Sequence, residues 1–528
     1  MTKNESSVHV LIAGAGPAGL MMACQLALHN ISFRIIDKKA SPTICSGALI
    51  IHARTLEILQ QMGLAEKAIE MGIIARTINI RFNKQKNIAI DFSEIGKSLT
   101  RFPFLLMLEQ WHTENLLEEF LKEHNHKVEN KTELVAFTLQ NELVTAEVKK
   151  PDGSIELVNS KFLIGADGNG SLVRTQLKIP FPGITHKPLL FITDCEARIP
   201  LSTEEILFAF SKKYTTGFFP LAGKGRRVDG FIPVLQGKEE VSFDEVKDFF
   251  GRNSDSGVEL KNPQWFSIFR SHSRCVHNYR QNRCFLVGDA AHIHSPVGAQ
   301  GMNTGIQDAY NLAWKLAFFI NNKASDNLLD SYEEERRPVA LHVIRYTDFA
   351  YSFMTGNSRL KRILRLQLAP LFLPLLLKWF KKNSKISTRI FTWISGIAIS
   401  YGKNLPRGLS NVNFPAHAPA PGERLPFLVF ETGGKSMELC DILDSRMYSL
   451  VVFGKQEIPE SFQKIIDEYC GIISIKHIPS EAGTLQLFEA YGIKSEGCYL
   501  IRPDIYIAWR SHEFHPTELS HYLQNQLK

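Results

Sequence analysis

A glycine-rich turn near the start of the chain constrains the fold more than any other feature. The apolar run Val8–Ile12 is typical of a buried parallel strand, and it leads into Gly14-Ala15-Gly16-Pro17-Ala18-Gly19. A helical stretch, Leu20–Leu28, and a second apolar run, Ser32–Ile36, follow, and the second run ends at Asp37. The order predicts a strand–helix–strand unit of about thirty residues.

The residue types in this turn suit a bound dinucleotide. Gly14 permits the tight turn, Gly16 lets backbone amides approach a pyrophosphate, and Gly19 lets the helix pack on the sheet. The helix start adds about half a positive charge facing the phosphates, and Asp37 can accept hydrogen bonds from ribose hydroxyls. The six residues from Gly14 to Gly19 and Asp37 are therefore candidate cofactor ligands of a Rossmann-type domain. This motif alone does not separate NAD from FAD.

Two later segments carry a resemblance to a known family. One is Leu163-Ile164-Gly165-Ala166-Asp167-Gly168, with Ser171 and Arg174 after it. The other is Gly288-Asp289-Ala290-Ala291-His292, which leads to Pro296 and Gly298-Ala299-Gln300-Gly301-Met302-Asn303. With these motifs in family order, nearly the whole chain resembles the single-component FAD-dependent aromatic hydroxylases (p-hydroxybenzoate hydroxylase-like). It is most similar to the phenol and polyketide hydroxylases with a C-terminal thioredoxin-like domain.

The resemblance implies a cofactor role for several residues. Asp289, after Gly288, would hydrogen-bond the ribityl chain of FAD. Asp167 and Gly168 match a motif that serves both FAD and the nicotinamide cofactor. The backbone amides of Gly301, Met302 and Asn303 would face the flavin carbonyls. Gln110 would touch FAD, and Pro296 would lie beside the reacting carbon.

One position departs from the family pattern. Relatives usually carry an arginine that supports the FAD pyrophosphate where this chain has Gly47. We therefore expect either looser FAD binding or replacement of that cation by Lys38, Lys39 or Arg54.

The resemblance also implies the reaction. NAD(P)H would reduce FAD during a transient visit, since the chain has only one GxGxxG motif. O2 would then form a flavin C4a-hydroperoxide that hydroxylates a phenolic or polyketide-like ring. Two alternatives stay open: a peripheral membrane monooxygenase acting on a lipophilic ring or quinone precursor, and a flavin-binding protein without hydroxylase activity.

The expected architecture is α/β: a Rossmann-type FAD-binding domain with an inserted, mostly antiparallel substrate sheet, plus a C-terminal thioredoxin-like domain. Short aromatic and β-branched runs broken by Gly and Pro predict the inserted sheet. The predicted boundaries are 1–180 and 270–345 for the discontinuous FAD domain (with part of the substrate region at about 75–105), 181–269 for the sheet, 346–410 for a basic helical segment, 411–426 for a linker and 427–528 for the thioredoxin-like domain without CxxC.

The net charge of +7 has a local origin. Between Asp348 and Glu423 the chain has eleven Lys and Arg and no acidic residue. Five of the cations follow helical spacing in a helix expected to start near Leu375: Lys378, Lys381, Lys382, Lys385 and Arg389. Residues 359–393 therefore either bind an anionic membrane surface or form a solvated helix face. The remainder of the chain is slightly acidic, which argues against a nucleic-acid partner.

Other features restrict the class of protein further. The eight Cys include no CxxC pair, and we see no signal peptide, which fits a cytoplasmic location. His292 and His294 form an HxH pair without a third ligand nearby in sequence, so we expect no metal.

Four aromatics either line a substrate pocket or belong to ordinary core: Phe210, Phe218, Phe219 and Phe231. A homodimer stays open.

Overall fold

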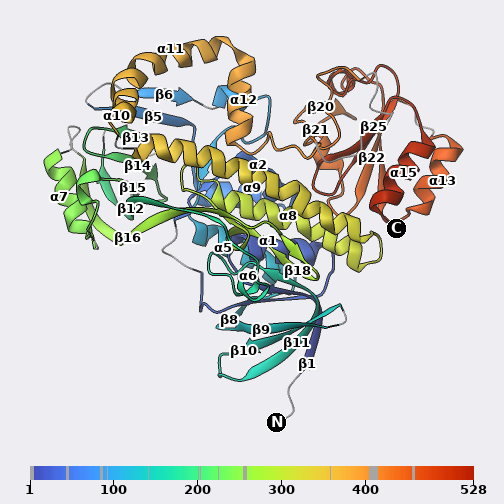
Figure 1. Cartoon of the computed structure of the whole chain (residues 1–528). Coiled ribbons are helices and arrows are strands. Elements are labelled where there is room, and N and C mark those ends of the chain that lie inside the picture. Colours follow the sequence, from blue (N-terminus) through green and yellow to red (C-terminus); the bar gives the residue numbers. More distant parts are fainter. Residues whose placement is uncertain are drawn as a thin grey trace.

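The computed structural model describes residues 5–527, apart from 43–46, 84–86, 92, 141, 200, 203, 224, 239, 254–257, 357, 403–413 and 455–457. Figure 1 shows a mixed sheet near the N-terminus, a second large sheet beside it, and a C-terminal part on the far side of two long helices. This arrangement confirms the expected α/β class with an inserted sheet and a C-terminal α/β unit.

The first sheet has the strand order β17-β18-β11-β1-β2-β8. Its strands are β1 (Glu5–Ala13), β2 (Phe33–Asp37), β8 (Glu129–Asn130), β11 (Ile155–Gly165), β17 (Arg280–Gln281) and β18 (Cys284–Leu286), and β9 (Glu133–Gln140) and β10 (Leu143–Lys149) extend it beside β11. Strand β1 pairs in parallel with β11 and β2, and β11 pairs in parallel with β18. The carboxyl ends of these four strands therefore share one edge of the sheet, where open α/β folds bind ligands.

Apolar helices cover this sheet. They are α1 (Pro17–Leu28), α5 (Gln110–Glu123) and α8 (Gly301–Ile320), and α1 contacts both of the others. Helix α1 begins three residues before the predicted Leu20, because Pro17 occupies its first turn, where a proline costs no hydrogen bond. Residues Gly19–Ala27 are all buried, so α1 forms the centre of the main core.

The second sheet has the order β19-β16-β12-β15-β14-β13-β5-β6 and is antiparallel except between β13 and β5. Its strands are β5 (Thr77–Phe82), β6 (Ile88–Asp91), β12 (Gly183–Arg198), β13 (Glu205–Phe210), β14 (Thr215–Pro220), β15 (Arg226–Phe231), β16 (Glu259–Cys275) and β19 (His292–Ile293). Helix α7 (Phe243–Asn253) packs against β16. A small sheet of β3 (Ile50–Ile51), β7 (Leu105–Met107) and β4 (Ile73–Ala75) accompanies the two large ones.

The segment after α9 (Asp326–Thr355) differs from the sequence prediction. The structure has α10 (Arg359–Ile363), α11 (Ala369–Lys382) and α12 (Ser384–Ile394), so the helix starts six residues before Leu375 and contains Pro374. Asn383 separates α11 from α12 with non-helical dihedrals (φ −108°, ψ 82°). The prediction of one continuous basic face is therefore wrong, because the helix direction changes at Asn383. Lys403 and Arg407 lie outside the described residues.

The C-terminal part has a four-stranded sheet of order β23-β22-β24-β25. Its elements are β22 (Tyr448–Phe453), α13 (Glu460–Glu468), β23 (Ile473–Ile478), α14 (Leu485–Ala490), β24 (Gly497–Ile501), β25 (Ile507–Ser511) and α15 (Pro516–Gln526), preceded by the hairpin β20 (Val429–Thr432) and β21 (Lys435–Glu438). Residues 414–426, interpreted from composition as part of a linker, instead pack on this part. Arg510 donates to the carbonyls of Ala418 and Pro419, and Gly422 donates to that of Ile507.

Candidate active site

A cavity of about 840 Å³ joins the carboxyl edge of the first sheet to one face of the second sheet. Of the predicted cofactor ligands, these line it: Gly14, Gly16, Pro17, Ala18, Asp37, Lys38, Gln110, Asp167, Gly168, Gly288, Asp289, Gly301 and Met302, together with Pro296. Ala15, Gly19, Arg54 and Asn303 are not among the lining residues. Motifs that are far apart in the sequence thus meet in one space, as the strand order requires.

The turn after β1 has the backbone geometry that a diphosphate needs. Gly14 adopts a φ of +104°, and a Cβ there would lie 2.3 Å from the carbonyl oxygen of Ala166. A Cβ on Gly16 would meet no atom within 4 Å, so this position opens onto the cavity. Asp37 accepts from the amides of Ala15 (2.7 Å) and Lys39 (2.8 Å), which fixes its carboxylate while leaving lone pairs for further donors.

A hydrogen bond connects the Asp167 loop to the segment that contains Asp289. Asp167 Oδ2 accepts from the amides of Leu172 (2.7 Å) and Val173 (3.2 Å), whereas its Oδ1 is buried without a hydrogen-bond partner. Arg174 donates to the carbonyl of Ala290 at 2.9 Å and so connects this loop to the Gly288–Ala290 segment. The Asp289 carboxyl lines the cavity. The surrounding protein removes part of its hydration, which raises its pKa, although the charge of His292 acts to lower it.

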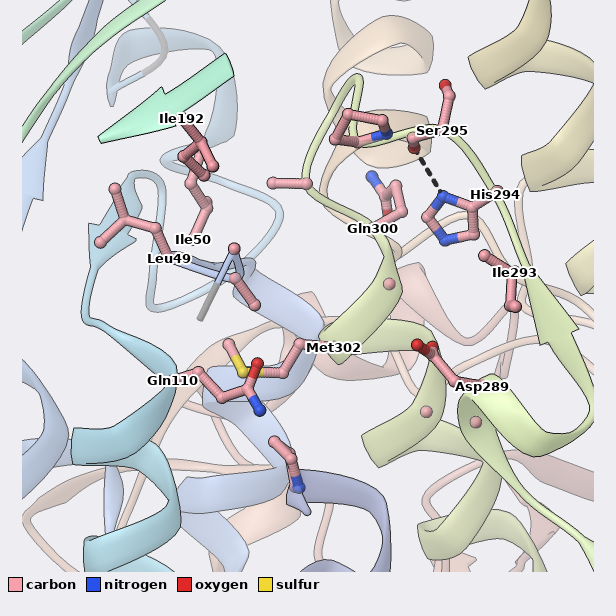
Figure 2. A pocket seen from close by; sticks show the side chains of 18 of the residues that line it. Leu49, Ile50, Gln110, Ile192, Asp289, Ile293, His294, Ser295, Gln300 and Met302 are labelled. Atoms are coloured by element: carbon pink, nitrogen blue, oxygen red, sulfur yellow. Dashed lines mark hydrogen bonds between the residues drawn. The ribbon is translucent and has the colours of Figure 1, made fainter. Parts of the chain in front are cut away.

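Helix α8 begins at the cavity, with Gly301 and Met302 in its lining. In Figure 2, Gln110 and Met302 point into the same space, Asp289 and His294 lie across from them, and Ile192 approaches from the second sheet. The Asn303 side chain makes structural contacts. It accepts from the His52 amide and donates to the Ile50 carbonyl, and thereby fixes β3 against α8.

Arg54 does not reach the cofactor end of the cavity. Its side chain is buried, donates to the carbonyl of Asp504 (3.0 Å), pairs with Glu57 (3.3 Å) and lies over the rings of Tyr310 and Tyr506. It therefore belongs to the junction with the C-terminal part. Of the three cations considered as replacements near Gly47, only Lys38 and Lys39 line the cavity, and both are exposed.

The two histidines of the HxH pair have different environments. His292 is buried and its Nε2 lies 2.6 Å from Asp308, which also pairs with Arg336 at 2.7 Å. His294 lines the cavity, its Nδ1 contacts the Ser295 carbonyl (Figure 2), and its Nε2 is buried without a partner. Burial lowers the pKa of His294 to about 4, so this imidazole is neutral at pH 7.

Aromatic and branched side chains form the wall of the cavity on the second sheet. Phe210, Phe219 and Phe231 line it, whereas Phe218 points to the opposite face and packs in a separate core. Strand alternation explains the division, because successive residues of β14 face opposite sides. The wall is completed by residues the sequence did not indicate, among them Ile192, Ile206, Phe208, Phe269 and Tyr351.

One carboxyl interrupts this apolar wall. Asp229 on β15 lies opposite Ile192 of β12 and Gly217 of β14, and it lines the cavity. A Cβ on Gly217 would come within 2.8 Å of the Asp229 carboxyl, so the glycine makes room for it. Burial raises the pKa of Asp229 to about 7, although Arg227 and the Gly217 amide act to lower it.

Arg227 is too strongly engaged to neutralise Asp229. Its Nε and Nη2 donate to the two carboxylate oxygens of Asp194 at 2.7 and 2.8 Å, and Nη1 donates to the carbonyl of Ala48. Trp265 Nε1 also donates to Asp194. Sequence reasoning missed Arg227, Asp194 and Asp229. The only signal was the presence of charged residues in runs otherwise rich in aromatic and branched side chains.

The residues at the cofactor end fit FAD. The open position at Gly16, the orphaned Asp167 oxygen and the accessible Asp289 carboxyl offer contacts for a diphosphate and for hydroxyl donors. Fold and site thus define a flavin-dependent oxidoreductase. Two family models match the chain: "FAD binding domain" over residues 7–347 and "Aromatic-ring hydroxylase, C-terminal" over residues 418–527. The chain belongs to the FAD-dependent aromatic-ring hydroxylases and is a monooxygenase of this family.

Relatives and solved structures agree with this assignment. The chain is 35% identical to the 6-methylpretetramide 4-monooxygenase of Streptomyces rimosus, over 74% of this chain and 70% of the relative. It is 32% identical to the pentachlorophenol 4-monooxygenase of Sphingobium chlorophenolicum, over 66% of this chain and 65% of the relative. The structure resembles that of the anhydrotetracycline hydroxylase from Streptomyces rimosus, with 27% identity, a TM-score of 0.75 and coverage of 98% of this chain and 99% of the other.

Proposed function

We propose that this monooxygenase hydroxylates a phenolic, polyketide-like ring, with NAD(P)H as reductant and O2 as second substrate. The observation that carries the proposal is the single cavity that connects the glycine-rich turn to the aromatic wall of the second sheet. Bound FAD supplies electron transfer from NAD(P)H and activation of O2. Relatives named for 6-methylpretetramide, anhydrotetracycline and pentachlorophenol support an aromatic substrate class.

The residues at one end of the cavity bind the cofactor. The backbone from Gly14 to Gly16 and the start of α1 bind the diphosphate, since a helix N-terminus favours negative charge. Asp37 and Asp289 accept hydrogen bonds from hydroxyl groups. Lys38 and Lys39 supply positive charge at the exposed side, in place of the arginine missing at Gly47.

The residues at the other end bind and activate the substrate. The aromatic wall holds a flat ring and excludes water. Exclusion of water limits the loss of activated oxygen as hydrogen peroxide. Asp229 accepts the proton of a substrate hydroxyl on its carboxylate, and the ring oxygen keeps the electron pair. The resulting phenolate is a stronger nucleophile than the phenol, so this transfer favours attack on activated oxygen.

Product analysis with a blocked-cavity variant tests the proposal. The flavin-loaded protein is incubated with NAD(P)H and a panel of phenols and tetracyclic aromatic polyketides, and products are analysed by mass spectrometry. We expect at least one substrate to gain an oxygen atom. Ile192→Trp, which places a larger ring in the substrate end of the cavity, should greatly reduce the product, whereas Ile184→Trp, at an exposed position of the same strand, should retain it.

The outcomes separate the alternatives. NAD(P)H consumption that yields only hydrogen peroxide with every substrate would favour a flavin-binding protein without hydroxylase activity. Equal product formation by both tryptophan variants would contradict the assignment of this cavity as the substrate site.

A further inference from the structure

Helix α11 exposes several large apolar side chains on one of its faces. Leu371 and Leu375 are each 64% exposed, Phe372 is 59% exposed and Trp379 is 48% exposed. At about 100° per residue, these four and Leu376 lie within about 140° of the helix circumference, which makes a single continuous face. We call this outer face of α11 the apolar ridge. Soluble monomers rarely expose so many large apolar side chains together, and such patches mark interaction sites.

The chain segment that carries the apolar ridge has charges of one sign only. The exposed side chains Arg359, Arg362, Lys378, Lys385 and Arg389 lie on α10, α11 and α12. No acidic residue occurs in the sequence between Asp348 and Glu423. Arg365 differs from these five cations, because it is buried and donates to the carbonyls of Phe353, Met354 and Gly356 at the end of α9.

We propose that the apolar ridge and its flanking cations bind α10–α12 to the surface of an anionic lipid bilayer. Apolar side chains enter the boundary between headgroups and acyl chains, while Lys and Arg attract anionic headgroups. A second copy of the chain fits less well. A two-fold symmetric contact places the same patch on both sides, so the cations would face each other across the interface. Within the described residues, no helix is long and apolar enough to cross a bilayer.

The inner face of the same segment adjoins the cavity. Leu366, Ala369 and Leu373 pack with Phe82, Phe210 and Met354, and the last two also line the cavity. Figure 1 shows α11 at the outer edge of the molecule, above β5 and β6. Only a thin layer of side chains therefore separates the bilayer-facing helix from the cavity. Resting on the proposed function, this placement indicates a lipophilic aromatic substrate taken from the membrane.

Vesicle flotation tests membrane binding without relying on catalysis. The flavin-loaded protein is mixed at low salt with vesicles of phosphatidylcholine, with or without phosphatidylglycerol. We expect at least tenfold stronger binding to the anionic vesicles, and weaker binding as salt is added. Leu371→Asp/Leu375→Asp should reduce this binding tenfold or more, whereas Val234→Asp, at an exposed apolar position outside α10–α12, should not.

A charge-reversal pair keeps the test valid if the aspartate variant fails to fold. Lys378→Glu/Lys385→Glu should also reduce binding to anionic vesicles at least tenfold, whereas Lys464→Glu/Lys494→Glu in the C-terminal part should leave it unchanged. Equal affinity for both vesicle types, or absence of binding to either, would overturn the proposal. So would a dimer that Leu371→Asp/Leu375→Asp converts to a monomer, since the ridge would then be a subunit interface. None of these readouts depends on hydroxylation, so failure of the proposed function would be seen separately.

Discussion

The Asp229 carboxyl shows how one residue connects burial to chemistry. Its cross-strand neighbours are an isoleucine and a glycine, neither of which can donate a side-chain hydrogen bond. The nearby guanidinium of Arg227 is already bound by Asp194. Burial therefore raises the pKa of Asp229 to about 7, where a carboxyl can exchange a proton at physiological pH.

We expect Asp229→Asn to lower kcat/KM for a phenolic substrate by about 10²-fold, the lower end for loss of a general base. In the wild-type enzyme, hydroxylation should increase as pH rises through about 7, because Asp229 loses its proton there. The variant should lack this increase. Initial rates of product formation between pH 5.5 and 9 measure both effects. An electron-poor phenol that is already ionised should lose much less, and an equal loss for both substrates would contradict the role of base.

The same substitution has an expected effect on stability. Because the folded state raises the pKa of Asp229 above its ordinary value of 3.8, ionisation of this group opposes folding as pH rises from about 4 to 7. Asparagine carries no charge, so Asp229→Asn should raise Tm at pH 8 relative to the wild-type enzyme and change it little at pH 4. Thermal unfolding at the two pH values checks the sign.

The sequence predicted residues at the glycine-rich end of the cavity better than residues at its aromatic end. Asp289 and Asp167 follow glycine motifs whose spacing sets their place at the end of a strand. Asp229 belongs to no motif, and a charged residue in a strand ordinarily faces solvent. Its orientation depends on the pairing of β15 with β12 and β14, which are separate stretches of the chain. Arg54 shows the converse, because its sequence position beside a motif did not reveal that it contacts Asp504.

At the scale of elements, the turn between β1 and α1 joins fold and cofactor binding. A Cβ on Gly19 would lie 1.9 Å from the carbonyl oxygen of Gly14, whereas a Cβ on Gly16 would extend into open space. The two glycines are therefore required for different reasons. Gly19 permits the close approach of helix to turn, and Gly16 leaves open the space proposed for the diphosphate.

We expect Gly19→Ala to destabilise the flavin-free protein by about 1–3 kcal/mol, the usual cost of overpacking. Gly16→Ala should leave the unfolding midpoint of the flavin-free protein unchanged, because Gly16 has an ordinary φ of −77° and space for a methyl group. Both variants should bind FAD more weakly. Denaturant unfolding and flavin titration measure the two properties, and equal destabilisation by both substitutions would contradict this distinction.

The long periodic elements were predictable, but their ends were not. Strand β1, helix α1 and strand β2 follow the expected pattern because their apolar runs are strong, although α1 begins earlier than predicted. The break at Asn383 was missed, because the spacing of the cations suggested an uninterrupted helix. The outward direction of the apolar ridge was equally hidden, since sequence periodicity does not say which apolar face is covered.

At the scale of the whole molecule, a buried ionic cluster joins the C-terminal part to α8 and α9. Glu335 accepts from Arg502 (2.5 and 2.9 Å) and from Lys315 (2.7 Å), and Arg502 also binds Asp504. Trp314 and Phe318 of α8 pack against Tyr448 beside this cluster. The C-terminal part is therefore docked by buried charge and apolar contacts together. Residues so distant in sequence gave no sign of their pairing.

Arg502→Met should destabilise the protein by about 3–5 kcal/mol, because it leaves Glu335 and Asp504 buried with too little positive charge. Arg446→Met, which removes an exposed pair with Asp444 in the same part of the chain, should cost less than about 1 kcal/mol.

Burial alone would raise the pKa of Glu335, but Arg502 and Lys315 outweigh it and hold the pKa below the ordinary value of 4.5. The stability that Glu335 contributes is thus present above about pH 4.5 and lost as pH falls further, so the effect of Arg502→Met should shrink in acid. Denaturant unfolding at pH 7 and pH 3 measures this difference. A pH-independent effect, or one no larger than that of Arg446→Met, would show that the apolar contacts alone hold the C-terminal part in place.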